Sequence, residues 1–132
     1  MVLDFLFSRN KPRKTSFLLI DEDPELGVLL ECYLKAALGN QFKLVHVSKV
    51  TQALEKAASD RFDYFLLDVS LAIEPGVHEI HNLLKSTQKR AILLLLSASG
   101  EEPKKSVPND VPIIDKLKIR KLISCGLFAD AS

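Results

Sequence analysis

The sequence predicts an α/β protein in which one parallel β-sheet is covered by helices on both faces. Short apolar runs alternate along the chain with segments whose apolar residues recur every three or four positions, the periods of buried strands and amphipathic helices. The run at 91–97, AILLLLS, is apolar on both faces, which is typical of a strand inside a parallel sheet. A chain of 132 residues with no internal repeat fits a single domain.

The first half of the chain contains two strand–helix pairs. They comprise a strand at 16–20, a helix at 24–38, a strand at 43–47 and a helix at 50–59. The first helix has the clearest signals, because Pro24 suits its first turn and Gly39 with Asn40 ends it. Its buried face is predicted from the apolar residues at 26, 29, 30, 33, 34 and 37.

The second half adds three strands and two helices. They comprise a strand at 62–68, a helix at 76–87, strands at 91–97 and 111–116, and a helix at 118–125 that Gly126 ends. Between residues 97 and 116 the chain carries Pro103, Pro108 and Pro112, and a proline inside a helix costs roughly 3 kcal/mol. We therefore expect the helix of this segment to be stunted, and Pro112 to place the last strand at a sheet edge.

Right-handed crossovers between these strands give a doubly wound sheet of the flavodoxin type, with strand order 2-1-3-4-5. In that architecture ligands bind beyond the carboxyl ends of the strands, near the switch point between the first and third strands. We expect the domain to span residues 15–132, after an extension at 1–14.

The extension at 1–14 combines an apolar cluster with basic residues. Its apolar residues are Val2, Leu3, Phe5, Leu6 and Phe7, and its basic residues are Arg9, Lys11, Arg13 and Lys14. The segment could dock on the domain, be disordered, or act as an amphipathic tag for a membrane surface or a partner. Five apolar residues give only marginal membrane affinity, which favours docking or disorder.

Composition excludes several classes of function. A net charge of +1, the absence of Trp and 7% aromatic residues indicate no nucleic-acid partner. No stretch approaches the roughly 20 apolar residues of a membrane span. Cys32 and Cys125 match no metal-ligand spacing, so we expect two buried thiols in a reducing, cytoplasmic compartment.

Polar residues follow four of the five predicted strands directly. Asp21 and Glu22 follow the first strand, and Asp68, Ser97 and Lys116 come at the ends of the third, fourth and fifth. Carboxylates brought together at one edge repel each other unless a cation is present, and oxygen ligands with few protein contacts suit Mg²⁺. A lysine and a serine can bind phosphoryl oxygens, and an aspartate can accept a phosphoryl group as a nucleophile.

In these residues the sequence resembles the receiver domain of two-component response regulators, from residue 16 to about 125. The family's acidic pair matches Asp21 and Glu22, and its phosphoacceptor matches Asp68. Its Ser/Thr and Lys at the ends of the fourth and fifth strands match Ser97 and Lys116. Pro24 and Gly76 also stand where the family has them.

The resemblance implies a phosphorelay, in which Asp68 accepts a phosphoryl group from a histidine kinase or phosphotransfer protein. It implies Mg²⁺ held by Glu22, Asp68 and the backbone carbonyl of Ser70, with Asp21 acting mainly through water. Lys116 and Ser97 would bind the phosphoryl group. The implied protein is a signalling module rather than an enzyme. A flavodoxin-like nucleotide-binding enzyme is disfavoured, because no glycine-rich phosphate loop follows the first strand.

Two departures from the family's pattern keep a second hypothesis open. Ile113 stands where the family has an aromatic switch residue, and Leu117 follows Lys116 where the family usually has proline. The chain could therefore be a receiver-like interaction module that keeps the acidic pocket without switching on phosphorylation. His78 and His81 are expected to face solvent rather than bind a metal, and His46 to be a satisfied, partly buried residue.

Overall fold

The computed structural model describes residues 13–71, 76–88, 90–98 and 110–128. Their elements are β1 (Thr15–Ile20), α2 (Pro24–Leu38), β2 (Phe42–Val47), α3 (Val50–Ser59), β3 (Tyr64–Asp68), the 3₁₀ turn η1 (Val69–Leu71), α4 (Gly76–Thr87), β4 (Ile92–Ser97), β5 (Ile113–Asp115), the 3₁₀ turn η2 (Lys116–Lys118) and α5 (Ile119–Ser124). The extension at 1–12 and most of the proline-rich segment, residues 99–109, lie outside this part of the chain.

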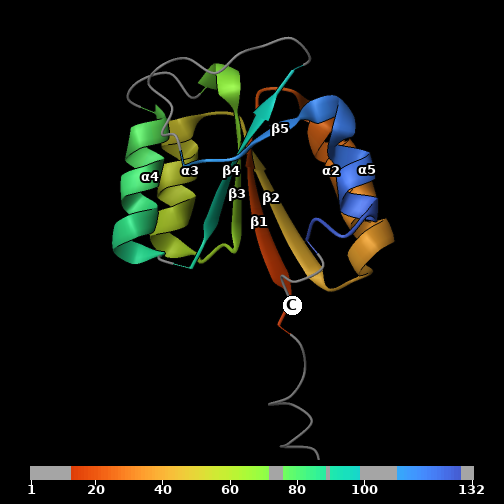
Figure 1. Ribbon diagram of the computed structural model, residues 1–132. Coiled ribbons are helices and arrows are strands. Elements are labelled where there is room, and N and C mark those ends of the chain that lie inside the picture. Colours follow the sequence, from red (N-terminus) through yellow and green to blue (C-terminus); the bar gives the residue numbers. More distant parts are fainter. Residues whose placement is uncertain (1–12, 72–75, 89, 99–109, 129–132) are drawn as a thin grey trace, which may run out of the picture.

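The five strands form one parallel sheet in the order β2-β1-β3-β4-β5. The predicted fold class and strand order are therefore confirmed. β5 is an edge strand, in agreement with the position of Pro112 just before it, since proline has no amide hydrogen to donate to a ladder. In Figure 1 helices α3 and α4 cover one face of the sheet, and α2 and α5 cover the other.

Two apolar layers hold the helices to the sheet, because alternate residues of each strand point to opposite faces. Leu18 and Phe65 pack with α3 and α4 on one face, and Phe17 and Leu66 pack with α2 and α5 on the other. Both faces of β1 and β3 are buried, which explains why these runs show no polar alternation.

The helices begin and end at the predicted residues in three cases, α2, α3 and α4. In α2 the side chain of Asp23 accepts a hydrogen bond from the Glu25 amide, Pro24 occupies the first turn, and Gly39 ends the helix with φ of 63°. This positive φ favours glycine, and the caps satisfy backbone groups that a helix end leaves unpaired.

The third and fifth strands are shorter than predicted. β3 begins at Tyr64 rather than 62, because the side chain of Asp63 accepts a hydrogen bond from the Ser16 amide at 2.7 Å. β5 ends at Asp115, because its carboxylate accepts from the Leu117 amide at 2.9 Å and turns the chain into η2.

The expectation that both cysteines are buried is wrong. Cys32 and Cys125 are free and exposed. Leu26, Leu30 and Leu34 supply the buried face of α2, and Cys32 falls on the opposite side of that helix. None of the described helices is long and apolar enough to cross a membrane.

Candidate functional site

The candidate site lies at the carboxyl edge of the sheet. Asp21 follows β1, Asp68 and Ser97 are the last residues of β3 and β4, and Lys116 follows β5. The parallel register pairs Asp68 with Leu96 and Ser97 with Asp115, so these strand ends lie side by side. The sheet therefore brings together residues that are up to 95 positions apart, as the sequence predicts.

Lys116 joins the two aspartates. Its Nζ lies 2.8 Å from Oδ2 of Asp21 and 3.2 Å from Oδ1 of Asp68. Asp21 is only 2% exposed and Asp68 7%, whereas the Lys116 side chain is 22% exposed. Oδ2 of Asp21 accepts no well-directed hydrogen bond among the described residues, so its contact with Lys116 is chiefly electrostatic. One ammonium thus partly neutralises two buried carboxylates.

The charge of Lys116 is held in place by its neighbours. Burial alone would lower the pKa of its ammonium group, but the close contacts with Asp21 and then Asp68 outweigh burial. They raise the pKa above its ordinary value of 10.5. Lys116 is therefore a fixed positive charge at neutral pH, 3.2 Å from the Asp68 carboxylate.

Asp68 is oriented by the turn that follows it. The Ser70 amide donates to its Oδ1 at 3.3 Å, and the Ser70 hydroxyl donates to its Oδ2 at 2.6 Å. The sequence predicts a role only for the backbone carbonyl of Ser70. The role of its side-chain hydroxyl is not predicted. The available signal is the spacing, because a serine two residues after an aspartate can close such a turn on it.

The second acidic residue of the predicted pair lies apart from this cluster. Glu22 is exposed, whereas the Oδ1 of Asp21 accepts a hydrogen bond from the Asp23 amide at 2.8 Å. Within the described ranges, no three His, Cys, Asp or Glu side chains are grouped so that they could hold a metal ion.

The donor chemistry at Asp21 and Asp68 fits a hard cation, because both offer carboxylate oxygens and Oδ2 of Asp21 is buried without a well-directed hydrogen bond. Lys116 bridges these carboxylates. The expected magnesium ligands, including Glu22 and the Ser70 carbonyl, remain a prediction.

The residues at the positions that the resemblance predicts to respond to a change at the site are Ser97, Ile113 and Leu117. Ser97 is 6% exposed, and its hydroxyl donates to the Ala98 carbonyl at 2.9 Å. Ile113, at the position where the resemblance places an aromatic residue, is 41% exposed. Leu117 is 77% exposed, and its amide is used by the Asp115 turn. A proline at 117 would have no amide to donate, so the Asp115 turn depends on this departure from the family's pattern.

A contact that the sequence does not predict supports Asp21 from β2. Nε2 of His46 lies 2.8 Å from the Asp21 carbonyl oxygen, and a Cβ atom on Gly27 would come within 2.4 Å of Nδ1 of His46. Gly27 thus leaves the space that the imidazole ring occupies. His46 is satisfied as expected, although it is exposed rather than partly buried.

We expect Gly27→Ala to have opposite effects with and without His46. In the His46→Ala background, alanine should stabilise α2 by up to about 1 kcal/mol, because glycine is a poor helix former. With His46 present, the new Cβ displaces the ring from the Asp21 carbonyl and cancels or reverses this gain. Urea unfolding of the four proteins of the cycle measures the coupling. Equal effects in both backgrounds would mean that Gly27 and His46 do not interact.

The other two histidines are half-buried, although the sequence predicts solvent-facing side chains. The side chain of His81 is 18% exposed, and its Nε2 lies 3.8 Å from Oδ2 of Asp110. His81 therefore links α4 to the chain just before β5.

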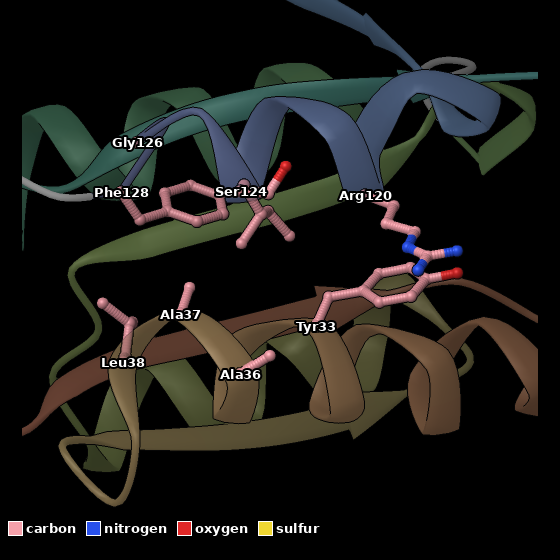
Figure 2. Close-up of a pocket in the computed structure, with 9 residues that line it drawn as sticks. Tyr33, Ala36, Ala37, Leu38, Arg120, Ser124, Gly126 and Phe128 are labelled. Carbon is pink, nitrogen blue, oxygen red and sulfur yellow. The ribbon is translucent and has the colours of Figure 1, made fainter.

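A hollow of about 400 Å³ is lined by residues of α2, of α5 and of the segment that follows α5. Figure 2 shows Tyr33 and Arg120 facing each other at one end, and Leu38 and Phe128 at the other. Closer to the candidate site, α2 exposes Val28 and Leu29, and Leu117 follows Lys116.

Solved structures of known proteins have the same fold. The chemotaxis response regulator CheY4 of Vibrio cholerae matches with a TM-score of 0.68 and 18% identity, over 88% of this chain and 98% of its own. A putative response regulator from Chloroflexus aurantiacus matches with a TM-score of 0.69 and 17% identity, over 90% and 98%. The signal receiver domain of an HD domain-containing protein from Pseudomonas fluorescens matches at 0.64 and 19%, over 89% and 94%.

No protein-family model and no curated protein matches the sequence. At 17–19% identity the structural matches show the fold alone. That fold is the one of response regulator receiver domains, as the residues at the strand ends indicate.

Proposed function

We propose that this chain is a phosphoacceptor receiver domain of a two-component phosphorelay, a signalling module rather than an enzyme. Asp68 takes a phosphoryl group from a histidine kinase or phosphotransfer protein, and the domain then signals through protein–protein contacts. The observation that carries this proposal is the Asp68 carboxylate at the end of β3, with Lys116 Nζ 3.2 Å from Oδ1.

The chemistry needs a positioned carboxylate and a nearby positive charge. An Asp68 oxygen attacks phosphorus and forms the O–P bond, while the P–N bond to the donor histidine breaks. The histidine nitrogen keeps the bonding electron pair and is then protonated. Transfer of this kind depends on positioning and charge neutralisation. Lys116 provides the charge, since its ammonium can contact the phosphoryl oxygens in the same way that it contacts the Asp68 carboxylate.

Two further roles belong to the same proposal. Mg²⁺ would be held by Asp68, Glu22 and the Ser70 carbonyl, with Asp21 acting mainly through water, and would neutralise phosphoryl charge when bound. The Ser97 hydroxyl would leave the Ala98 carbonyl and donate to the phosphoryl group. Both roles follow from the resemblance and from the position of these residues at one sheet edge.

The partner would dock beside the pocket. Val28 and Leu29 near the start of α2, and Leu117 after Lys116, are large apolar side chains left in solvent, and such side chains around a polar site favour protein contacts. We expect the protein in the cytoplasm, because two exposed free thiols suit a reducing compartment.

An interaction module that does not switch is the second candidate. Ile113 and the local hydrogen bond of Ser97 favour it, because neither residue is arranged as an aromatic-coupled switch. In this case Asp68 can still be modified, but the modification would not change the shape of the domain.

Incubation with Mg²⁺ and acetyl phosphate tests the first proposal. We expect the mass of the wild-type protein to rise by one phosphoryl group, and Asp68→Asn to remain unmodified, because an amide oxygen is a poor nucleophile. Asp60→Asn is the matched control, since Asp60 is an exposed aspartate at the opposite edge of the sheet. Modification of Asp68→Asn, or none of the wild type, would rule out Asp68 as the acceptor.

Amide chemical shifts with and without beryllofluoride separate the two candidates. Shifts that extend from Asp68 to β5 and α5 indicate a working switch. Shifts confined to residues around Asp21 and Asp68 indicate a module that binds the phosphoryl mimic without responding to it.

A further inference from the structure

A second polar hollow lies at the amino-terminal edge of the sheet, away from Asp68. It has a volume of about 590 Å³ and lies where the chain enters β1, β3 and β4, at the lower edge of the sheet in Figure 1. Its charged or amide side chains are Arg13, Arg61, Asp63, Gln88 and Arg90. Three arginines at one hollow distinguish this edge from the acidic edge that carries the candidate site.

The hollow is shaped by a buried amide. Gln88 is 8% exposed, and its Oε1 accepts from the Phe62 amide at 2.9 Å. Its Nε2 donates to the Ala57 and Asp60 carbonyls at 2.9 and 3.1 Å. These hydrogen bonds hold the loop before β3 against the loop before β4, and Arg61 and Arg90, one from each loop, both line the hollow.

Two of the arginines have no acidic partner in the described parts of the chain. Arg13 pairs with Asp63, but Arg61 and Arg90 are exposed and form no ion pair there. They are not needed to balance the negative ends of α3 and α4, because Lys56 and Lys85 already occupy the last turns of these helices.

The chain that enters β1 at this edge carries more charge of the same sign. Lys14 is exposed beside Arg13, and the sequence has Arg9 and Lys11 shortly before them. Further ahead stands the apolar cluster of residues 2–7. The described basic residues of this group lie at one edge of the sheet, and the buried carboxylates of Asp21 and Asp68 lie at the opposite edge, a separation of charge that the net value of +1 does not reveal.

We propose that this arginine edge docks on an anionic lipid bilayer. Guanidinium groups bind phosphate oxygens in a bidentate manner, and each basic residue near an anionic membrane contributes about 1 kcal/mol. The apolar cluster alone gives marginal affinity, but membrane binding becomes stable when an apolar anchor is joined to a basic patch. The structure supplies that patch with Arg61 and Arg90, which the sequence does not show to be neighbours of the extension.

A bilayer fits these observations better than a nucleic acid. The exposed guanidinium groups at the hollow can bind phosphate, but its aromatic member, Phe62, is 4% exposed and cannot stack on a base. Docking by this edge also leaves the Asp68 site pointing away from the membrane, where a soluble partner can reach it.

Co-sedimentation of the full chain with vesicles tests the proposal. We expect binding to phosphatidylcholine vesicles that contain phosphatidylglycerol, little binding to phosphatidylcholine alone, and weaker binding as salt rises. The double variant Arg61→Gln/Arg90→Gln should bind about 10- to 30-fold more weakly. Lys118→Gln/Lys121→Gln is the matched control, because it removes the same charge from exposed residues of η2 and α5. Circular dichroism checks that each variant is folded.

Three outcomes would overturn the proposal. The first is equal binding to both vesicle types, and the second is an equal loss in the control variant, which would indicate net charge alone. The third is that the protein binds inorganic phosphate or an oligonucleotide through Arg61 and Arg90 but does not bind vesicles. This result would assign the edge to a different ligand. Asp68→Asn should bind vesicles normally, so this result is independent of the proposed phosphoacceptor function.

Discussion

At pH 7, Lys116→Met is expected to lower the free energy of unfolding by roughly 2 kcal/mol. The substitution keeps an apolar stem of similar length but removes the ammonium that lies within 3.2 Å of both Asp21 and Asp68. Two buried carboxylates are then left facing each other without a positive charge. The cost is below that of a fully buried pair, because Lys116 is 22% exposed. Urea unfolding at several pH values measures it.

The pH dependence follows from the raised pKa of Lys116. The stabilisation is fully present below the ordinary pKa of 10.5 and is lost as the pH rises through the higher pKa of the folded state. The difference between wild type and Lys116→Met should therefore stay constant from neutral pH to about 10 and shrink above 10.5. Lys118→Met, two residues away and exposed, should have little effect. Equal stability of Lys116→Met and wild type would show that the two ion pairs contribute nothing net.

Gln88→Leu is expected to cost roughly 3 kcal/mol of unfolding free energy, by leaving buried polar groups without partners. The Phe62 amide and the Ala57 and Asp60 carbonyls all bond to the Gln88 side chain. Leucine fills similar space but offers no donor or acceptor. Denaturant unfolding measures the loss, and hydrogen exchange at the Phe62 amide should become faster.

Ser86→Ala is the control for this substitution. Ser86 lies in the last turn of α4, two residues before Gln88, and its exposed hydroxyl donates to the Leu83 carbonyl of its own helix. We expect a change below about 0.5 kcal/mol, as for other surface positions. If Gln88→Leu changed stability as little as Ser86→Ala does, water would have to replace the three hydrogen bonds of the amide.

The sequence predicts the sheet well because its strands are continuous apolar runs and its helices carry their own end signals. Pro24 and Gly39 mark α2 without help from the rest of the fold. Strand ends are harder to predict, because they depend on contacts with distant residues. The side chain of Asp63 accepts a hydrogen bond from the amide of Ser16, 47 positions away, and β3 therefore begins only after Asp63.

The same division holds for the candidate site. Parallel strands bring their carboxyl ends to one edge, so the positions of Asp21, Asp68 and Lys116 follow from topology. The way Lys116 is shared between two aspartates, and the fit of His46 over Gly27, have no signal in the sequence. The error over Cys32 has a different cause, since the apolar period of α2 already assigns position 32 to the exposed side.

Lys116 has a second property, which comes from its place in the chain. It opens η2, and α5 begins three residues later at Ile119, which packs against the sheet. The ammonium group that contacts the two carboxylates thus belongs to the turn that leads directly into α5. Through η2, the residue that contacts both carboxylates is joined directly to α5, which borders the hollow beside α2. This covalent connection from the Asp21–Asp68 edge to the surface of α5 does not involve the side chain of Ile113.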